Sequence, residues 1–251
     1  MRASGRVSTA RFFTAARQWD LDVVSSALRA HPDLARATDR VGRSALHLTA
    51  GTDVRRARRP ASSSIAVARA LLDAGADVDA VQPIRDGGES FPARPIWQAI
   101  ARGGNRPLAR FLLRRGADPN WCYWAVVWND DIATAKLLDA HQANVDLTFH
   151  GETPLVYATR LRRTRMMRWL LSRGAKVDLA DADGWTPLHH AVKRRHAMPE
   201  LELLLTYGAS LTHAAADGST PLSAAGPRLA AALRACAERV AIRDAAAPAP
   251  A

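Results

Sequence analysis

The chain has 251 residues, of which 48% are hydrophobic, and its formal net charge is +11 at pH 7. The hydrophobic content suffices for a continuous core, but no apolar run approaches the about 20 residues that a membrane-spanning helix needs, so we expect no membrane association. Lysine occurs only at Lys136, Lys176 and Lys193, so arginine carries almost all of the positive charge. A basic protein favours anionic partners by long-range attraction, although GC-rich coding alone also produces a composition rich in arginine and alanine.

The two cysteines, Cys122 and Cys236, have no CxxC spacing, so the sequence predicts neither a zinc site nor a disulfide framework. Reduced thiols fit a cytoplasmic protein. Residues 1–10 are basic and are not followed by an apolar segment, so we predict a flexible N-terminus without a secretory signal. Because HExxH, GxSxG and P-loop motifs are all missing from the sequence, we expect no enzyme activity, no catalytic residue, no cofactor and no metal.

The first predicted unit, residues 11–39, has two apolar stripes that divide near Trp19 and Asp20, which is typical of a helical hairpin. Its second helix ends at His31-Pro32 because proline cannot continue a helix. We interpret this unit as an N-terminal cap, whose outer face can contact water.

The second and third units, residues 40–80 and 81–120, each carry an enlarged loop. In the second unit, an arginine-rich loop over 51–64 precedes a helix over 65–72. Insertions in repeat arrays often lie on the binding face, although a solvated loop is the alternative. In the third unit, turn-forming residues over 82–90 predict an enlarged finger, followed by helices over 95–101 and 107–113.

The fourth unit, residues 121–146, departs most from its neighbours. From Asn120 the chain passes directly into WCYWAVVWNDD, so the turn before the first helix is nearly absent. Tyr123 and Trp124 stand where the other units have leucine and histidine, and we expect these large rings to fill the core there.

The fifth and sixth units, residues 147–178 and 179–212, are the most regular, and Pro199 fits the first turn of a helix. The seventh, residues 213–240, is predicted to end with a helix over 228–240 that has one polar side. The Ala/Pro-rich residues 241–251 are predicted to be a disordered tail.

Two short motifs recur through these units. The closing motif ends the second helix, and its alanines at 76, 117, 143, 175 and 209 give spacings of 41, 26, 32 and 34 by subtraction. The opening motif stands at the start of the first helix and reads Ser44-Ala45-Leu46-His47, Pro95-Ile96-Trp97, Thr153-Pro154-Leu155-Val156, Thr186-Pro187-Leu188-His189 and Thr220-Pro221-Leu222-Ser223.

A spacing near 33 with a TPLH-type opening resembles the ankyrin repeat, and the resemblance covers about residues 9–240. It implies an all-α, ankyrin-repeat solenoid of about seven helix-turn-helix units with short β-hairpin fingers, in which the fourth unit lacks most of its finger. Threonine then caps the helix, proline occupies its first turn, and His47 and His189 form hydrogen bonds between neighbouring units.

The resemblance also implies a binding surface, because the last turn of the first helix and the residues just before it face the partner in ankyrin proteins. Tryptophan and arginine, which are over-represented in interface hot spots, occur at these positions. Unrelated surface residues on an arginine-rich protein are the alternative interpretation. The predicted partner-binding residues are Arg102, Trp128, Asn129, Phe149, His150, Glu152, Arg160, Asp183, Trp185, Lys193 and Arg194.

We therefore expect a non-enzymatic, cytoplasmic and monomeric scaffold that binds a protein partner through its concave face, with an acidic segment favoured. Nucleic acid is the main alternative, because arginines in the inter-helix turns form a basic ridge that attracts phosphates. No helix-turn-helix, zinc finger or RNP-like motif accompanies this ridge. A second alternative is a bacterial effector delivered into a host cell, since ankyrin arrays are also used in that way.

Overall fold

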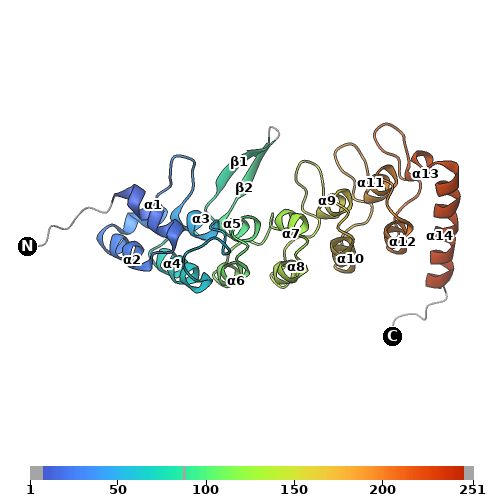
Figure 1. Ribbon diagram of the computed structural model, residues 1–251. Helices are drawn as coiled ribbons and strands as arrows, with labels where there is room; N and C mark the ends of the chain where they lie inside the picture. The colour runs from blue at the N-terminus through green and yellow to red at the C-terminus, as the bar shows by residue number, and fades with distance from the viewer. Residues whose placement is uncertain (1–7, 87–88, 246–251) are drawn as a thin grey trace, which may run out of the picture. The chain divides into compact units, whose positions relative to one another are not determined.

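The computed structural model describes residues 8–86 and 89–245, which form fourteen α-helices, one 3-10 helix and a two-stranded sheet (Figure 1). The prediction of a mainly helical fold is therefore confirmed. The chain divides into two compact units. The N-terminal unit extends to Val126 and includes Ala133–Ala143, and the C-terminal unit comprises Val127–Ile132 and the residues from Asn144 onward.

The N-terminal unit is built from helical hairpins whose first helices pack on one another in order, as do their second helices. The first hairpin shows how local signals set the boundaries. Ser8 and Asp20 cap two helices by accepting hydrogen bonds from the backbone N–H groups of Arg11 and Val23. The elements are α1 (Thr9–Gln18), α2 (Leu21–Ala30), η1 (Pro32–Arg36), α3 (Ala45–Ala50), α4 (Ala61–Asp73), α5 (Pro95–Ala101), α6 (Arg106–Arg114) and α8 (Ile132–Asp139), with α7 (Tyr123–Asn129) spanning the division.

The predicted finger of the third unit is a β-hairpin of β1 (Gln82–Asp86) and β2 (Glu89–Ala93), and its turn at 87–88 lies outside the described residues. The strands are antiparallel, and Ile84 pairs with Phe91. The Phe91 ring packs at 4.9 Å from Trp97 and at 6.1 Å from Trp121 between ring centroids, so aromatic contacts hold the finger against the helices that follow.

The arginine-rich loop is shorter than predicted, because α4 begins at Ala61 instead of residue 65. Pro60 is the N-cap residue, and the three serines after Ala61 lie in the first turn of the helix. Backbone N–H groups in the first turn of any helix have no partner within the helix. Within the loop, Asp53 forms ion pairs with Arg55 and Arg56.

The elements of the C-terminal unit are α9 (Pro154–Arg160), α10 (Thr164–Ser172), α11 (Pro187–Lys193), α12 (Met198–Thr206), α13 (Pro221–Ala224) and α14 (Pro227–Ala245). This unit repeats the hairpin arrangement, and α9, α11 and α13 pack in order. In Figure 1 the loops that precede these helices rise on one side, while α10 and α12 lie on the other. Pro199 lies in the first turn of its helix, as predicted.

The last helix differs from the prediction in length. It continues to Ala245, five residues beyond Val240, so the first part of the predicted tail is helical. The segment after Val240 contains alanine, isoleucine and arginine without glycine or proline, and these residues favour helix continuation. The rest of the predicted tail, 246–251, and most of the predicted flexible N-terminus, 1–7, lie outside the described residues. None of the described helices combines the length and apolar character needed to cross a bilayer.

Candidate protein-binding surface

The opening motifs have a structural role, as predicted. The backbone N–H of Ser44 donates to Nδ1 of His47 at 3.2 Å, so the imidazole carries its proton on Nε2, which lies 3.1 Å from the carbonyl oxygen of Ala93. His189 repeats this arrangement with Thr186 and the carbonyl of Ser219. Burial lowers the pKa of both histidines, which favours the neutral ring that this bonding needs.

Trp128 lies in the last turn of α7, the first helix of the fourth repeat, and is 60% exposed. Asn129 beside it is also exposed. Nη2 of Arg163 donates to the carbonyl oxygen of Trp128 at 2.9 Å. This bond joins the end of α7 to the inter-helix turn that precedes α10 and holds the main chain that carries the exposed indole.

Trp185 lies on the finger before α11 and is half-buried. Its ring centroid is 6.1 Å from that of His189 and 5.3 Å from that of His190, and the Lys193 ammonium lies 5.7 Å from the indole. Nε2 of His190 lies 2.7 Å from a carboxylate oxygen of Asp181, which turns the imidazole toward the finger. Trp185 is therefore packed into the start of α11, with only part of its ring available to a partner.

The finger before α9 brings four predicted residues together. Phe149 and Glu152 exchange backbone hydrogen bonds of 3.0 Å, and the rings of Phe149 and His150 lie 4.0 Å apart between centroids. Glu152 forms an ion pair with Arg160 at the end of α9. The charge of this arginine is therefore offset within the protein.

The remaining predicted residues are exposed in separate places. Lys193 and Arg194 lie at the end of α11, and Asp183 lies on the finger before it, where its carbonyl accepts a hydrogen bond from the N–H of Ala216 at 3.0 Å. Arg102 follows α5 and belongs to the N-terminal unit. The predicted set is thus distributed over both units.

We expect Tyr123 and Trp124 to fill the core of the fourth repeat. Tyr123 is buried, as predicted, whereas Trp124 is only half-buried. Both cysteines are free and buried. Burial raises the pKa of the Cys122 and Cys236 thiols, which makes thiolate chemistry unfavourable at either residue.

Part of the predicted basic ridge is used in structural contacts. The guanidinium of Arg162 donates to the carbonyl oxygen of Arg194 at the end of the first helix of the next repeat, and that of Arg163 donates to Trp128 at the corresponding helix end of the preceding repeat. Sequence reasoning missed these bonds because they join residues 32 and 35 positions apart. Their separation, which is close to one repeat, is the signal that could have indicated them.

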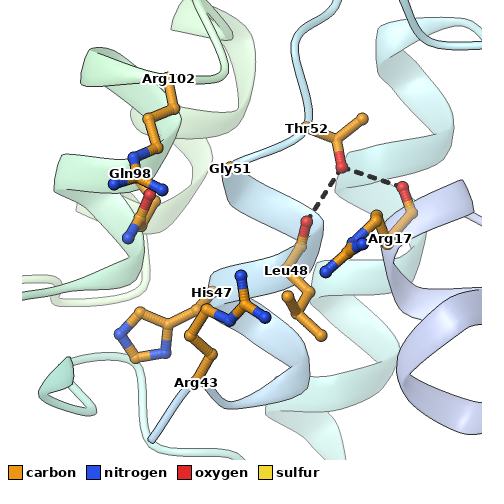
Figure 2. A pocket seen from close by; sticks show the side chains of 8 residues that line it. All are labelled: Arg17, Arg43, His47, Leu48, Gly51, Thr52, Gln98 and Arg102. Carbon is orange, nitrogen blue, oxygen red and sulfur yellow. Dashed lines mark hydrogen bonds between the residues drawn. The ribbon is translucent and has the colours of Figure 1, made fainter. Parts of the chain in front are cut away.

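Sequence reasoning also missed a hollow on the N-terminal unit, which Arg102 lines together with Arg17, Arg43 and Gln98 (Figure 2). Arg17 lies in the last turn of α1, the first helix of its repeat. Arg102 lies at the same end of α5, directly after the last residue of that helix. Extending the comparison of helix ends back to the first repeat would have found it.

Two family profiles match the sequence. The profile described as "Ankyrin repeats (3 copies)" matches residues 96–181, and the one described as "Ankyrin repeat" matches residues 183–216. The chain is 28% identical over 117 residues to Ankyrin repeat domain-containing protein 13C of Danio rerio, a match that covers 46% of this chain and 24% of the relative. It is 31% identical over 115 residues to a putative ankyrin repeat protein of Rickettsia bellii (strain RML369-C), covering 45% and 46%. The matches thus span less than half the length of either relative.

Solved structures share the architecture over most of the chain. The human ASB11 ankyrin repeat domain superposes with a TM-score of 0.66 at 25% identity, covering 90% of this chain and 96% of that domain. The ankyrin repeat domain of Bcl-3, described as a unique member of the IkappaB protein family, gives a TM-score of 0.69 at 22% identity, covering 89% and 97%. Together with the opening motifs and their histidine bonds, these similarities show that the chain belongs to the ankyrin repeat family.

Proposed function

We propose that the protein is a non-enzymatic scaffold that binds a partner protein through the ends of its first helices and its fingers, the face that is concave in an ankyrin stack. Ankyrin repeats are in general protein-protein interaction modules. In the C-terminal unit we name these residues the docking surface: Trp128, Asn129, Phe149, His150, Glu152, Arg160, Asp183, Trp185, Lys193 and Arg194. Arg102 belongs to the N-terminal unit and is not counted in this surface.

The exposure of Trp128 is the observation that carries this proposal. A tryptophan that is 60% exposed leaves most of a large apolar ring in water. Burying such a ring against a partner removes roughly 150–250 Å² of surface from water, which is why tryptophan is enriched in interface hot spots. The position of the ring at the end of a first helix agrees with this use.

Preorganisation supports the same proposal. Arg163 holds the main chain of Trp128, the histidines of α11 hold Trp185, and Glu152 holds Arg160. Side chains that are already fixed lose little conformational entropy on binding, so more of the contact energy contributes to affinity.

The contacts of the basic ridge favour a protein partner over nucleic acid. Arg160 is paired with a carboxylate, and Arg162 and Arg163 donate to backbone carbonyls. The exposed Lys193 and Arg194 then suit an acidic protein segment, to which they add orientation and faster association.

Affinity capture tests the proposal with the intact chain as bait in a lysate of the organism that encodes it. Trp128→Ala is the test variant. Tyr207→Ala is the matched control, because Tyr207 is 41% exposed but follows α12, a second helix. We expect the Trp128 variant to lose the captured protein, by about tenfold or more for a hot-spot residue, and the Tyr207 variant to retain it. Equal capture by the two variants would contradict the proposal.

A further inference from the structure

The N-terminal unit carries a hollow of about 360 Å³ on the side of its first helices (Figure 2). Three successive repeats line it. Arg17 comes from the end of α1, Leu48 and Thr52 from α3 and the residues just after it, and Arg102 from the end of α5. All of these belong to one compact unit.

The hollow has a positive charge that the protein does not neutralise. Arg43 at its edge forms an ion pair of 2.8 Å with Asp39. Burial works against ionisation of Asp39, but hydrogen bonds from Arg43 and Val41 outweigh it and lower the pKa of this carboxyl, so the pair stays charged. Arg17 and Arg102 are exposed, and no carboxylate in the described part of the chain pairs with either of them.

The other polar groups around the hollow are already engaged. The hydroxyl of Thr52 donates to the carbonyl oxygens of Arg17 and Leu48 at 2.9 and 3.0 Å, which are the dashed lines in Figure 2. The amide nitrogen of Gln98 donates to Gln82 at 3.0 Å. Both ring nitrogens of His47 also form hydrogen bonds within the protein, so the guanidinium groups are the donors that remain for a ligand. They favour an anion, because charge-assisted hydrogen bonds are the stronger kind.

We propose that this hollow binds the carboxylate side chains of an extended acidic peptide segment of the partner, with Arg17 and Arg102 as the principal contacts. This inference rests on the proposed protein-binding function and names the chemistry of the segment that is recognised.

The spacing of the helices suits an extended chain. Because α1 packs on α3 and α3 on α5, Arg17 and Arg102 lie two helix spacings apart, about 16–20 Å at the usual separation of packed helices. An extended segment rises about 3.3 Å per residue and places alternate side chains on one face, so about six or seven residues with acids at alternate positions span the hollow.

The lining argues against single-stranded nucleic acid. Proteins that bind single strands without sequence preference combine a positive groove with aromatic rings on which bases stack. The lining contains no phenylalanine, tyrosine or tryptophan, and its one imidazole, His47, is buried with both ring nitrogens occupied.

Fluorescence anisotropy tests the inference with the full chain and a labelled ten-residue peptide in which glutamate and alanine alternate. A peptide with glutamine in place of glutamate is the uncharged control. The test variant is Arg17→Gln with Arg102→Gln. The matched variant is Arg110→Gln with Arg114→Gln, which removes the same charge from exposed residues of α6, a second helix of the same unit. Circular dichroism verifies that both variants are folded.

We expect the Arg17/Arg102 variant to bind the glutamate peptide at least about tenfold more weakly than the wild type, because it loses charge-assisted hydrogen bonds to the peptide. The Arg110/Arg114 variant should bind within about twofold of the wild type, because only the screened long-range attraction changes. Equal weakening in the two variants would mean that net charge alone attracts the peptide and would overturn the inference. So would a failure of the wild type to prefer glutamate over glutamine, or tighter binding of a decathymidylate that depends on the same two arginines.

The two proposals fail in different ways. Partner capture that requires Trp128 but is unaffected by loss of Arg17 and Arg102 overturns the acidic-segment inference and leaves the docking surface intact. If peptide binding requires the two arginines but partner capture does not depend on Trp128, the docking surface is overturned and the acidic-segment inference stands.

Discussion

The seven tryptophans illustrate how the same side chain serves different purposes at different positions. Trp19 is 1% exposed, and its indole N–H donates to the carbonyl of Thr49 at 2.9 Å, which fixes the first hairpin to α3. Trp128 is 60% exposed, although it lies at a helix end as Trp19 does. The first ring stabilises the stack, and the second is available to a partner.

We expect Trp19→Ala to lower the free energy of unfolding by about 3–5 kcal/mol, since it removes a large buried ring and leaves a buried carbonyl without its donor. Trp128→Ala should change it by no more than about 0.5 kcal/mol, as is usual for an exposed side chain. Urea unfolding followed by circular dichroism measures both. A loss above about 2 kcal/mol for the Trp128 variant would mean that this ring is packed in solution, and the docking surface would lose its central residue.

At the residue level, the sequence predicts the position of a site residue better than its environment. The repeat register correctly indicates that Trp128 lies at the end of a first helix and that Tyr123 is buried. It does not show that Trp185 is half covered, because the covering groups, His190 and Lys193, take their orientation from the folded finger. The structure is needed wherever the neighbours of a side chain depend on how a finger folds against its own helix.

At the scale of elements, the recurring closing motif has a physical cause that its spacing alone does not show. The carboxylate of Asp178 accepts the backbone N–H of Ser210 at 3.0 Å, and Asp146 accepts that of Lys176 at the same distance. Asp79 accepts the N–H of Asp118 at 2.9 Å. Each closing aspartate therefore satisfies a donor of the next closing segment. The spacing of the closing motif can be found in the sequence because the aspartate that makes this bond recurs. The N–H group that each aspartate accepts is visible only in the folded chain.

Successive fingers in the C-terminal unit approach closely at Gly151, where a Cβ atom would lie 2.7 Å from Cβ of Ala182 on the next finger. Gly174 has a similar left-handed backbone, with φ of +83° against +70° for Gly151, but nothing lies within 4 Å of its added Cβ. Alanine at either position incurs the conformational cost of a positive φ. Only at position 151 does it also meet a neighbour.

We expect Gly151→Ala to be more destabilising than Gly174→Ala by about 1–3 kcal/mol, the usual cost of overpacking a tight contact. Chemical denaturation of the two variants under identical conditions gives this difference directly, because the backbone term is common to both. Equal stability of the variants would show that the fingers separate easily and are not packed rigidly side by side.

At the scale of the whole molecule, the division into two units coincides with an irregularity that the sequence shows. The spacing between the closing alanines at 117 and 143 is 26 residues by subtraction, the shortest of the series. The division falls in this same repeat, within α7 and around the start of α8. A repeat without most of its finger has fewer residues with which to contact both neighbours, so the array divides where the repeat is shortest.

Buried histidines couple the stability of the whole molecule to pH. His47, His189, His190 and His196 each have a pKa lowered chiefly by burial, partly opposed by hydrogen bonds or nearby carboxylates that raise it. The unfolded chain therefore takes up more protons than the folded one as the pH falls below the ordinary histidine pKa of about 6.5. The stabilisation from the neutral rings is complete above that pH and is lost as the pH decreases through it, by at most about 1.4 kcal/mol per pH unit for each histidine.

We accordingly expect the Tm to be constant between about pH 8 and 7 and to fall between about pH 6.5 and 5.5, since histidine titrates in that window. Differential scanning calorimetry at constant ionic strength measures the profile. The double variant His47→Gln and His189→Gln should have a lower Tm at pH 8, because two helix openings lose their imidazole bonds, and a flatter decline toward pH 5.5. A wild-type Tm that stays level or rises over the same window would contradict this prediction. It would show that these imidazoles become protonated without breaking their bonds to the neighbouring repeats, although the N–H groups of Ser44 and Thr186 require an unprotonated Nδ1.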